Sequence, residues 1–583
     1  MATLHLSGTE LELGKTRPPL NRNFLLAMAA TFLVAMHIFW PNPGGLGLAL
    51  SFNATTWIAL SFALAVGLYQ IGTNRTVRYS KLTIGLFLSA TMMSLPIIYS
   101  SPDMSNATGR LMGLWAGLLL FLVLQQFHFT NKHKQRLLWF VILACVFQAL
   151  VGYVQFFLLN EHNWFGYDTA ANRPYGVFQQ PNVMASFLAS GMVLSGYLLA
   201  RQPQKYNRRV SDVSILYFTP MLFAPLIIVL ASRTGWLSML FGCTLVLPYL
   251  YRFSTKKRFY GWIASNIIGL VIGVVIALSS NSGNLISYKS NLDSARATIY
   301  PQAIDMLIEK PFTGYGIGRF EPEYILYTAR QHQLNDGYPA GIAALDHPHN
   351  EILFWGVEGG LLPVLGILLA AIFVLSRIVR AKKGTRLAMF ALFVPIVLHS
   401  QLEYPFYLSA IHWIIFITLV YWVDQRSSTY YTTSFGIITK TLSRSLSLSL
   451  PIMVCAYMLT SLHTNMVLTR FEQSRPADPE ILKQVSNPVA WQDRYNWAIY
   501  RSLLELGLQS GERETLQPFI DWSISVIQRK PRPALYQNLI TAYLALGNES
   551  RARQVRYEAQ FLFPNHSFKI KEPVIEDVVN LHL

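Results

Sequence analysis

The sequence predicts an all-α protein that crosses a membrane about thirteen times. Two observations carry this prediction. Only 13% of the 583 residues are charged, whereas soluble domains contain about 25%. In addition, uncharged runs of spanning length recur along most of the chain, and the mean hydropathy is +0.33. Three further regions lie outside these runs: an N-terminal tail, one long polar loop and a C-terminal tail of soluble composition.

Each predicted span is an apolar run of about 20 residues, with tolerance for shorter ones. The runs are 24–40, 48–72, 82–99, 111–129, 137–159, 183–200, 213–231, 235–250, 259–279, 352–375, 387–399, 407–423 and 446–463. The first run has no small-residue cleavage site and follows a polar lead, so it is expected to remain as a helix. Cys145, Cys243 and Cys455 all fall within runs, where they are expected to pack rather than form disulfides.

The positions of Lys and Arg predict the orientation. Basic residues gather at 15–22, 75–81, 132–136, 201–209, 252–258, 377–386 and 426–444, and the short intervening loops hold chiefly Arg110, Arg173 and Arg233. By the positive-inside rule, the N-terminus is inside, and both the long loop and the C-terminal tail are outside. Much of the formal charge of +17 is therefore explained without a nucleic acid.

The predicted organisation has five parts: a tail over 1–23, helices over 24–279, an external loop over 280–351, helices over 352–463 and a helical region over 464–583. The loop is expected to contain a helix over 293–309. In the last region, Tyr500 and Gly511 recur 36 residues later as Tyr536 and Gly547, with leucines at matching places. This weak repeat is typical of tetratricopeptide-type helix pairs, although an ordinary helical hairpin also explains it.

His349 is the first candidate site residue. It lies in His347-Pro-His349-Asn350-Glu351, where the long loop meets an apolar run that carries Glu358. An imidazole titrates near neutral pH, so His349 is a candidate proton acceptor, and Asn350 or a nearby acid is expected to orient it. The alternative is a structural role in hydrogen bonding, which is the expectation for His37, His128, His412 and His463.

Two arginines are candidates for binding an anion. Arg233 separates two apolar runs on the outer side, and Arg296 opens the expected helix of the loop, near Lys289. A guanidinium binds phosphate oxygens through paired hydrogen bonds. The alternatives are a topological anchor or a salt bridge to Glu358 or Glu403 for Arg233, and a solvated helix surface for Arg296.

Two polar clusters interrupt the apolar pattern. One is His399-Ser-Gln401-Leu-Glu403-Tyr404-Pro-Phe406, and the other is Tyr175-Gly-Val-Phe-Gln179-Gln180-Pro-Asn182. Polar groups at membrane depth usually face a cavity or each other. Either cluster is also explained as a turn that satisfies backbone groups.

The sequence contains no phosphate-binding loop, dinucleotide turn, zinc motif or heptad, so we expect neither a cofactor nor a metal. The pair Glu321 and Glu323 is a weak cation candidate. If the substrate is an activated glycosyl diphosphate, Arg233 and Arg296 would stabilise the leaving charge in place of a metal.

Several motifs together resemble the O-antigen ligase superfamily. They are the His347–Glu351 segment followed by Glu358-Gly359, the turn Lys310-Pro-Phe-Thr-Gly314-Tyr-Gly316, and Ser232-Arg233-Thr-Gly-Trp-Leu237. The resemblance covers roughly residues 180–425. The segments 178–182 and 402–406, with the helical tail, resemble the branch of bacterial protein O-oligosaccharyltransferases.

This resemblance implies an inner-membrane enzyme whose long loop and tail are periplasmic. The donor would be an oligosaccharide on undecaprenyl diphosphate, transferred en bloc and with inversion to Ser or Thr of a pilin or another exported protein. By motif, His349 would be the essential histidine, and Arg233 and Arg296 would bind the diphosphate. Gln179, Tyr404, Asn350, His347 and Glu403 would be accessory.

Three alternatives remain open. An O-antigen ligase acting on lipid A-core, or an O-antigen polymerase, would keep the chemistry and change the acceptor. A flippase or transporter for lipid-linked sugars would also have many spans, but we see no duplicated halves of the kind common in transporters. A secretion scaffold built around the tail would leave the buried polar residues unexplained.

Overall fold

The computed structural model describes residues 20–202, 210–280, 295–474 and 477–569. Most of the predicted N-terminal tail, Lys289 and the first part of the long loop lie outside the described residues. Within them, ten helical segments are long and apolar enough to cross a membrane, which confirms a helical polytopic protein. These segments are α3 (Ser51–Asn74), α4 with α5 (Lys81–Ser94, Pro96–Tyr99), α6 (Met104–Leu124), α7 (Asn131–Phe157), α8 (Pro181–Arg201), α9 (Val210–Val229), α10 (Arg233–Phe253), α11 (Lys256–Leu278), α16 (Leu361–Arg380) and α21 (Ile437–Gln473).

The other three predicted runs form shorter or broken helices. They correspond to α2 (Asn21–Leu33), to the pair α17 (Arg386–Ala391) and α18 (Val394–Leu402), and to α20 (Ala410–Ser427). Pro395, at the start of α18, lacks the N–H that would continue α17, which favours the break there. The count of thirteen spans therefore stays a prediction.

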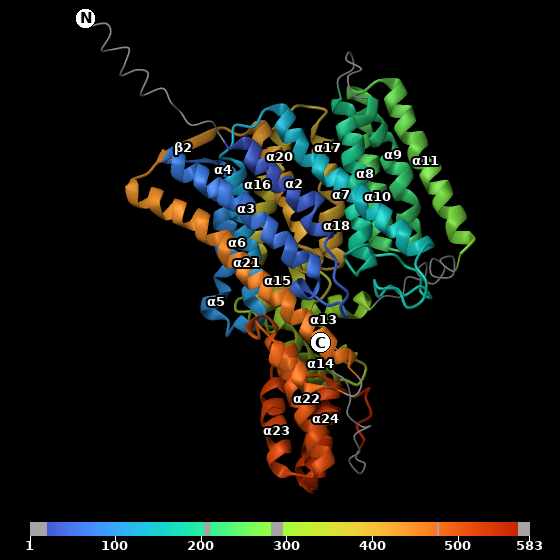
Figure 1. Cartoon of the computed structure of the whole chain (residues 1–583), viewed down its shortest axis with the longest axis vertical. Helices are drawn as coiled ribbons and strands as arrows, with labels where there is room; N and C mark the ends of the chain where they lie inside the picture. The colour runs from blue at the N-terminus through green and yellow to red at the C-terminus, as the bar shows by residue number, and fades with distance from the viewer. Residues whose placement is uncertain (1–19, 203–209, 281–294, 475–476, 570–583) are drawn as a thin grey trace, which may run out of the picture.

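Helix α8 is enclosed by its neighbours and packs against α7, α9, α10 and α18 (Figure 1). Every residue of its apolar window is buried. Small residues allow its neighbours to approach closely: a Cβ on Gly242 of α10 would lie 2.5 Å from Val193. In lipid the hydrophobic effect does not drive helices together, so membrane helices associate through close van der Waals packing of this kind.

The predicted span 352–375 is not one helix, so this part of the prediction was wrong. It divides at Gly360 into α15 (Glu351–Gly359) and α16. Gly360 has φ +74°, and a Cβ there would lie 2.7 Å from the carbonyl oxygens of Pro311 and Phe312. Glycine alone fits this close backbone contact. As a result Glu358 belongs to a short helix, α15, and not to a candidate span.

A small sheet is the second departure from the prediction, which was all-α. Strands β1 (Thr76–Ser80) and β2 (Tyr430–Ser434) pair antiparallel, with Thr76 opposite Ser434. Both segments are rich in Thr, Val and Tyr, which favour extended backbone. The pairing brings together two loops that the basic residues assign to the same side of the membrane.

The described part of the long loop and the C-terminal tail form one body at the opposite end of the molecule from β2 (Figure 1). The loop supplies α13 (Arg296–Glu309) and α14 (Phe320–Leu334), whose apolar residues share a buried cluster with Tyr536 and Ile540 of the tail. The Arg532 guanidinium of the tail forms a buried ion pair with Glu321 of the loop, at 2.8 and 3.2 Å. The loop and the tail are therefore on one side.

The tail contains two successive helical hairpins. They are α22 (Gln492–Ser510) with α23 (Arg513–Ile527), and α24 (Pro533–Ala545) with α25 (Glu549–Leu562). Gly511 and Gly547, the glycines of the predicted repeat, both adopt left-handed backbone just after the first helix of each pair, at φ +70° and +69°. The boundary expected at 464 is not a break, because α21 continues through it to Gln473.

Candidate active site

His349 lies in the extended segment that enters α15, held in an unusual backbone conformation. Its φ is +57°, which side chains rarely adopt, and its backbone N–H donates to Nδ1 of His347 at 2.8 Å. The hydroxyl of Tyr300, on α13, lies 3.0 Å from the His349 carbonyl oxygen and 2.9 Å from that of Gln401. Strained backbone of this kind persists only where surrounding contacts fix it, and it clusters at functional sites.

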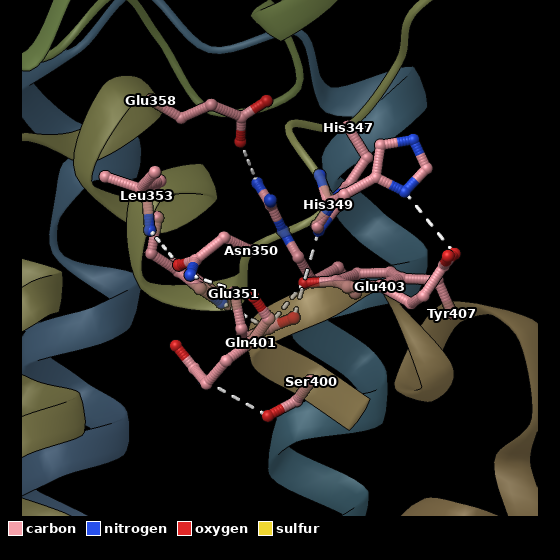
Figure 2. A network of polar contacts seen from close by, with 12 residues as sticks. His347, His349, Asn350, Glu351, Leu353, Glu358, Ser400, Gln401, Glu403 and Tyr407 are labelled. Carbon is pink, nitrogen blue, oxygen red and sulfur yellow. Dashed lines mark hydrogen bonds and ion pairs between the residues drawn. The ribbon is translucent and has the colours of Figure 1, made fainter. Parts of the chain in front are cut away.

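Glu403 joins two of the predicted site residues. Its Oε2 lies 3.4 Å from Nδ1 of His349, and its Oε1 forms an ion pair with Arg296. Figure 2 shows His349 and Glu403 in the network that joins the start of α15 to the 400–407 segment. Glu403 is nearly buried, whereas His349 and Arg296 keep 24% and 25% of their side-chain surface exposed. The carboxylate is thus internal, and both the imidazole and the guanidinium reach an open surface.

The charges around Glu403 determine its protonation. Burial alone would raise its pKa, but the close contact with His349, followed by the charges of Arg296 and His399, holds the pKa below the ordinary value of 4.5. An ionised carboxylate beside Nδ1 favours the tautomer that carries hydrogen on Nδ1. Nε2 of His349 then keeps a lone pair able to accept a proton. This carboxylate, rather than Asn350, is the group positioned to orient the imidazole.

Asn350 has a different contact from the one expected. Its Oδ1 accepts from the N–H of Leu353 at 3.0 Å and so caps α15, and its Nδ2 donates to the Gln401 carbonyl oxygen at 3.1 Å. Asn at this position supplies a partner for the first free N–H groups of a helix. The residue fixes the loop that carries His349 instead of contacting the ring.

Arg233 begins α10, where Ser232 caps the helix. The segment just before it is tied to Glu403 through two polar side chains. Arg173 donates to the carbonyl oxygens of residues 230 and 231 at 2.6 and 3.2 Å, and it also donates to Asn182 Oδ1 at 3.2 Å. Asn182 in turn donates to Glu403 Oε1 at 3.2 Å. The two acids offered as partners of Arg233 are engaged elsewhere: Glu358 with Arg110, and Glu403 with Arg296 and His349.

Tyr404 contacts both histidines, whose own ring centroids are 6.5 Å apart. Its ring centroid is 4.8 Å from that of His347 and 5.1 Å from that of His349. On one side it lines a cavity of about 2350 Å³, together with His347 and Gln179. Gln179 has φ +53° and donates to the Asn42 carbonyl oxygen at 3.1 Å, while its buried Oε1 has no partner among the described residues. His349, Arg296 and Glu403 are not part of the cavity lining.

The cavity has an apolar end and a polar end. Its apolar wall comes from α4, α6, α16 and α20, and its polar wall includes Asp346, Asp493, Arg501 and Lys530 from the loop and the tail. A space that passes from bilayer-facing helices to an aqueous domain is chemically suited to an amphiphile with a lipid chain and a polar head.

A second cluster, made of Glu351, Glu358 and Arg110, borders this cavity. The sequence did not predict that these three residues lie together. Arg110, on α6, forms a buried ion pair with Glu358 of α15. Glu351 accepts hydrogen bonds from Trp355 and Tyr407, each at 2.8 Å. Arg110 was only counted as a loop arginine. The one available signal was its isolation in a loop otherwise poor in basic residues.

Glu321 and Glu323, the weak candidates for binding a cation, both form ion pairs with arginines. Glu321 binds Arg532 of the tail, and Glu323 binds Arg319 one helical turn earlier at 2.7 Å. Within the described ranges, no group of three or more His, Cys, Asp or Glu residues is placed to hold a metal ion.

The fold and this geometry define a helical polytopic membrane protein with a polar site beside a large cavity. The family model described as O-antigen ligase matches residues 220–368, and that of a protein glycosylation ligase matches 174–199. The C-terminal model of a virulence factor membrane-bound polymerase matches 387–576. These matches confirm the predicted resemblance to the O-antigen ligase superfamily and, with the spanning helices, indicate a protein of the bacterial inner membrane.

Two curated relatives sharpen the resemblance. The chain is 24% identical over 317 residues to the general O-oligosaccharyltransferase of Acinetobacter baylyi, covering 50% of this chain and 52% of the relative. It is 25% identical over 285 residues to the ComP-specific O-oligosaccharyltransferase of the same organism, covering 47% and 48%. The chain thus aligns with about half the length of the curated relatives it matches.

Proposed function

We propose that this chain is an O-oligosaccharyltransferase of the bacterial inner membrane. It transfers a preassembled oligosaccharide en bloc from undecaprenyl diphosphate to Ser or Thr of a pilin or another exported protein. The likeness to two O-oligosaccharyltransferases and to the protein glycosylation ligase model favours this activity over a flippase or a scaffold. The observation that carries the proposal is the meeting of His349 and Arg296 on Glu403.

In the proposed reaction, Nε2 of His349 takes the proton of the acceptor hydroxyl while the oxygen attacks the anomeric carbon of the first sugar. The bond between that carbon and the phosphate oxygen breaks, and undecaprenyl diphosphate leaves with the electron pair. Attack opposite the leaving group inverts the anomeric centre. His349 then returns its proton to solvent.

Arg296 and Arg233 are the proposed diphosphate ligands. Charge grows on the leaving phosphate as the glycosidic bond breaks, so fixed guanidinium groups stabilise the transition state more than the ground state. Arg296 suits this role because its side chain remains one quarter exposed while Glu403 holds it. This assignment needs no metal or cofactor.

The orientation follows from the same proposal. The N-terminus is cytoplasmic, and the loop 280–351 and the tail 464–583 are periplasmic, where a lipid-linked glycan meets exported proteins. The two hairpins of the tail form a tetratricopeptide-like platform for the acceptor. Its support is the two successive hairpins, α22 with α23 and α24 with α25.

The direct test is intact-protein mass spectrometry of pilins from cells with and without this chain. We expect pilins to gain the mass of one oligosaccharide, at Ser or Thr, only where the chain is present. Identical pilin masses, with the chain expressed and inserted, would contradict transfer to pilins. The same comparison on all exported proteins distinguishes a pilin-specific enzyme from a general one.

A second candidate keeps the donor and changes the acceptor. The polymerase model over 387–576 and the O-antigen ligase model over 220–368 favour a polymerase or a ligase for lipid A-core. Purified chain is incubated with the lipid-linked oligosaccharide and either pilin or lipid A-core. Transfer to lipid A-core alone would replace the protein acceptor with a lipid one, and longer glycans on undecaprenyl diphosphate would indicate a polymerase.

A further inference from the structure

The cavity side of Tyr404 carries polar atoms that the proposed reaction does not use. His347 Nε2, Glu351 Oε2, and both Nε and Nη1 of Arg110 are buried and have no hydrogen-bond partner among the described residues. The side chains of His347 and Arg110 are 4% and 7% exposed. Buried polar atoms without partners cost about 1–3 kcal/mol each, so such a set calls for a ligand.

The hydrogen-bond roles of His347 and Glu351 are set by their other contacts. Nδ1 of His347 accepts the His349 N–H, so the neutral ring carries its hydrogen on Nε2 and donates there. Burial, followed by the charges of His349 and Arg110, holds the pKa of His347 well below its ordinary value, which keeps the ring neutral. Glu351 Oε1 already accepts two hydrogen bonds, which leaves Oε2 as the acceptor facing His347.

The spacing of these two atoms fits a bridging hydroxyl group. His347 Nε2 and Glu351 Oε2 are 3.9 Å apart, too far for a direct hydrogen bond. One oxygen between them can lie about 2.8 Å from both, accepting from His347 and donating to Glu351. A hydroxyl both accepts and donates, whereas a carbonyl only accepts and an ammonium only donates.

The walls around this pair suit a sugar. Phe354, Trp355, Tyr404 and Tyr407 line the same cavity, and aromatic side chains pack well against apolar C–H surface such as that of a sugar ring. The Arg110 guanidinium lies 4.4 Å from the centroids of both Phe354 and Trp355, while its Nη2 binds Glu358. Its remaining edge presents donors for further sugar oxygens. An apolar pocket with a few fixed polar groups is typical of a ligand site.

We infer that His347, Glu351 and Arg110 form a subsite for a sugar residue of the donor glycan, lined by Tyr404 and adjacent to His349. This inference rests on the proposed function and adds a glycan contact to the diphosphate contacts. The acceptor hydroxyl belongs at His349, which is absent from the cavity lining. The hydroxyl held by His347 and Glu351 is therefore one of the donor's own.

The sharpest variant is Glu351→Gln. The amide oxygen can still accept from Trp355 and Tyr407, while the amide nitrogen replaces Oε2 and turns the acceptor into a donor. A hydroxyl between two donors loses one hydrogen bond, and leaving a buried polar group without its partner accounts for about a ten- to hundredfold change in Kd. The matched control is Glu309→Gln, the same change at a carboxylate that is 37% exposed on α13.

The measurement is the Kd of the purified full chain for two probes. One is undecaprenyl diphosphate carrying an oligosaccharide that the unmodified chain transfers, and the other is undecaprenyl diphosphate alone. We expect Glu351→Gln to raise the first Kd about ten- to hundredfold and leave the second unchanged. His347→Asn, whose amide oxygen replaces Nδ1 but which lacks Nε2, should show the same selectivity.

Each other outcome overturns the subsite. Equal weakening of both probes would assign Glu351 to the diphosphate site or to the fold, and unchanged binding of both would remove it from the donor site. If only the KM for the acceptor protein changed, the hydroxyl between His347 and Glu351 would belong to the acceptor and not to the donor. If the unmodified chain transfers no glycan, the proposed function fails as well. If it transfers glycan but Glu351→Gln does not weaken binding of the glycan-bearing probe selectively, only the subsite is refuted.

Discussion

Two carboxylates of this protein each hold an arginine, but in different surroundings. Glu403 pairs with Arg296, which is 25% exposed, and also contacts His349. Glu358 pairs with Arg110, which is 7% exposed, and accepts from the Phe320 N–H at 3.2 Å. An exposed guanidinium can exchange its carboxylate for a phosphate, whereas a buried one cannot leave its partner unpaired. The Glu403–Arg296 pair is therefore suited to the reaction, whereas the Glu358–Arg110 pair is suited to stabilising the fold and to binding.

The largest effect is expected at His349. Because general-base help is commonly worth about 10²–10⁴-fold, His349→Ala should remove glycosylation of pilin in cells almost completely. Intact-protein mass spectrometry measures the glycosylated fraction, and membrane immunoblots confirm equal insertion. The control is His463→Ala, a histidine of α21 that hydrogen-bonds Ser486. Full glycosylation by the His349 variant would show that His349, with its contact to Glu403, has no catalytic role.

Arg110→Ala tests the buried pair. It leaves the Glu358 carboxylate, 1% exposed, without its cation, and breaking a buried pair costs about 3–5 kcal/mol. We expect a clear drop in thermal stability of the purified chain, measured by tryptophan fluorescence. Arg330→Ala is the matched control, because its pair with Glu309 is 47% and 37% exposed and should contribute almost nothing. Equal stability of the two variants would refute the contrast.

The ion pair between the tail and the loop is expected to have a smaller, local effect. Arg532→Ala leaves Glu321 buried at the interface, at a cost of about 3 kcal/mol or less. We expect faster proteolysis of the tail while the membrane helices stay intact. The control, Arg553→Ala, breaks a pair that is 60% and 69% exposed. Unchanged proteolysis of the Arg532 variant would show that apolar contacts alone hold the tail.

Glu403 is expected to give a dependence on pH. Its pKa in the folded chain lies below 4.5, so its ionised form contributes stability that is full above that value and is lost as the pH falls through the lowered pKa. The thermal stability of Glu403→Gln should therefore depend less on pH in this acidic range. Transfer by the variant should fall by about tenfold, since His349 loses the acceptor that sets its tautomer. Parallel stability curves for the variant and the unmodified chain would contradict the ionised pair.

The sequence was most informative where local chemistry decides the structure. Apolar runs predicted nine of the ten candidate spanning helices as single runs, and a proline, an asparagine and two histidines marked the start of α15. The sequence could not show the break at Gly360, because that glycine is required by the carbonyl groups of Pro311 and Phe312, a contact made only in the fold. Glycine is also common in unbroken membrane helices.

The sequence also could not show which charged residues pair with each other. Glu403 was expected to be accessory, and its place between His349 and Arg296 depends on a contact across 107 positions. Arg110 meets Glu358 across 248 positions. In a single sequence, an isolated charge shows that a partner is needed but does not identify it. The two carboxylate clusters therefore became distinguishable only from burial and geometry.

The central claim is that His349 acts in the chemical step, not in holding the donor. The most direct measurement compares purified His349→Ala with the unmodified chain, recording both the Kd for the lipid-linked oligosaccharide and the rate of transfer to pilin. We predict an unchanged Kd and a rate lower by about 10²–10⁴-fold. A variant that binds the donor and transfers it at the normal rate would contradict the claim.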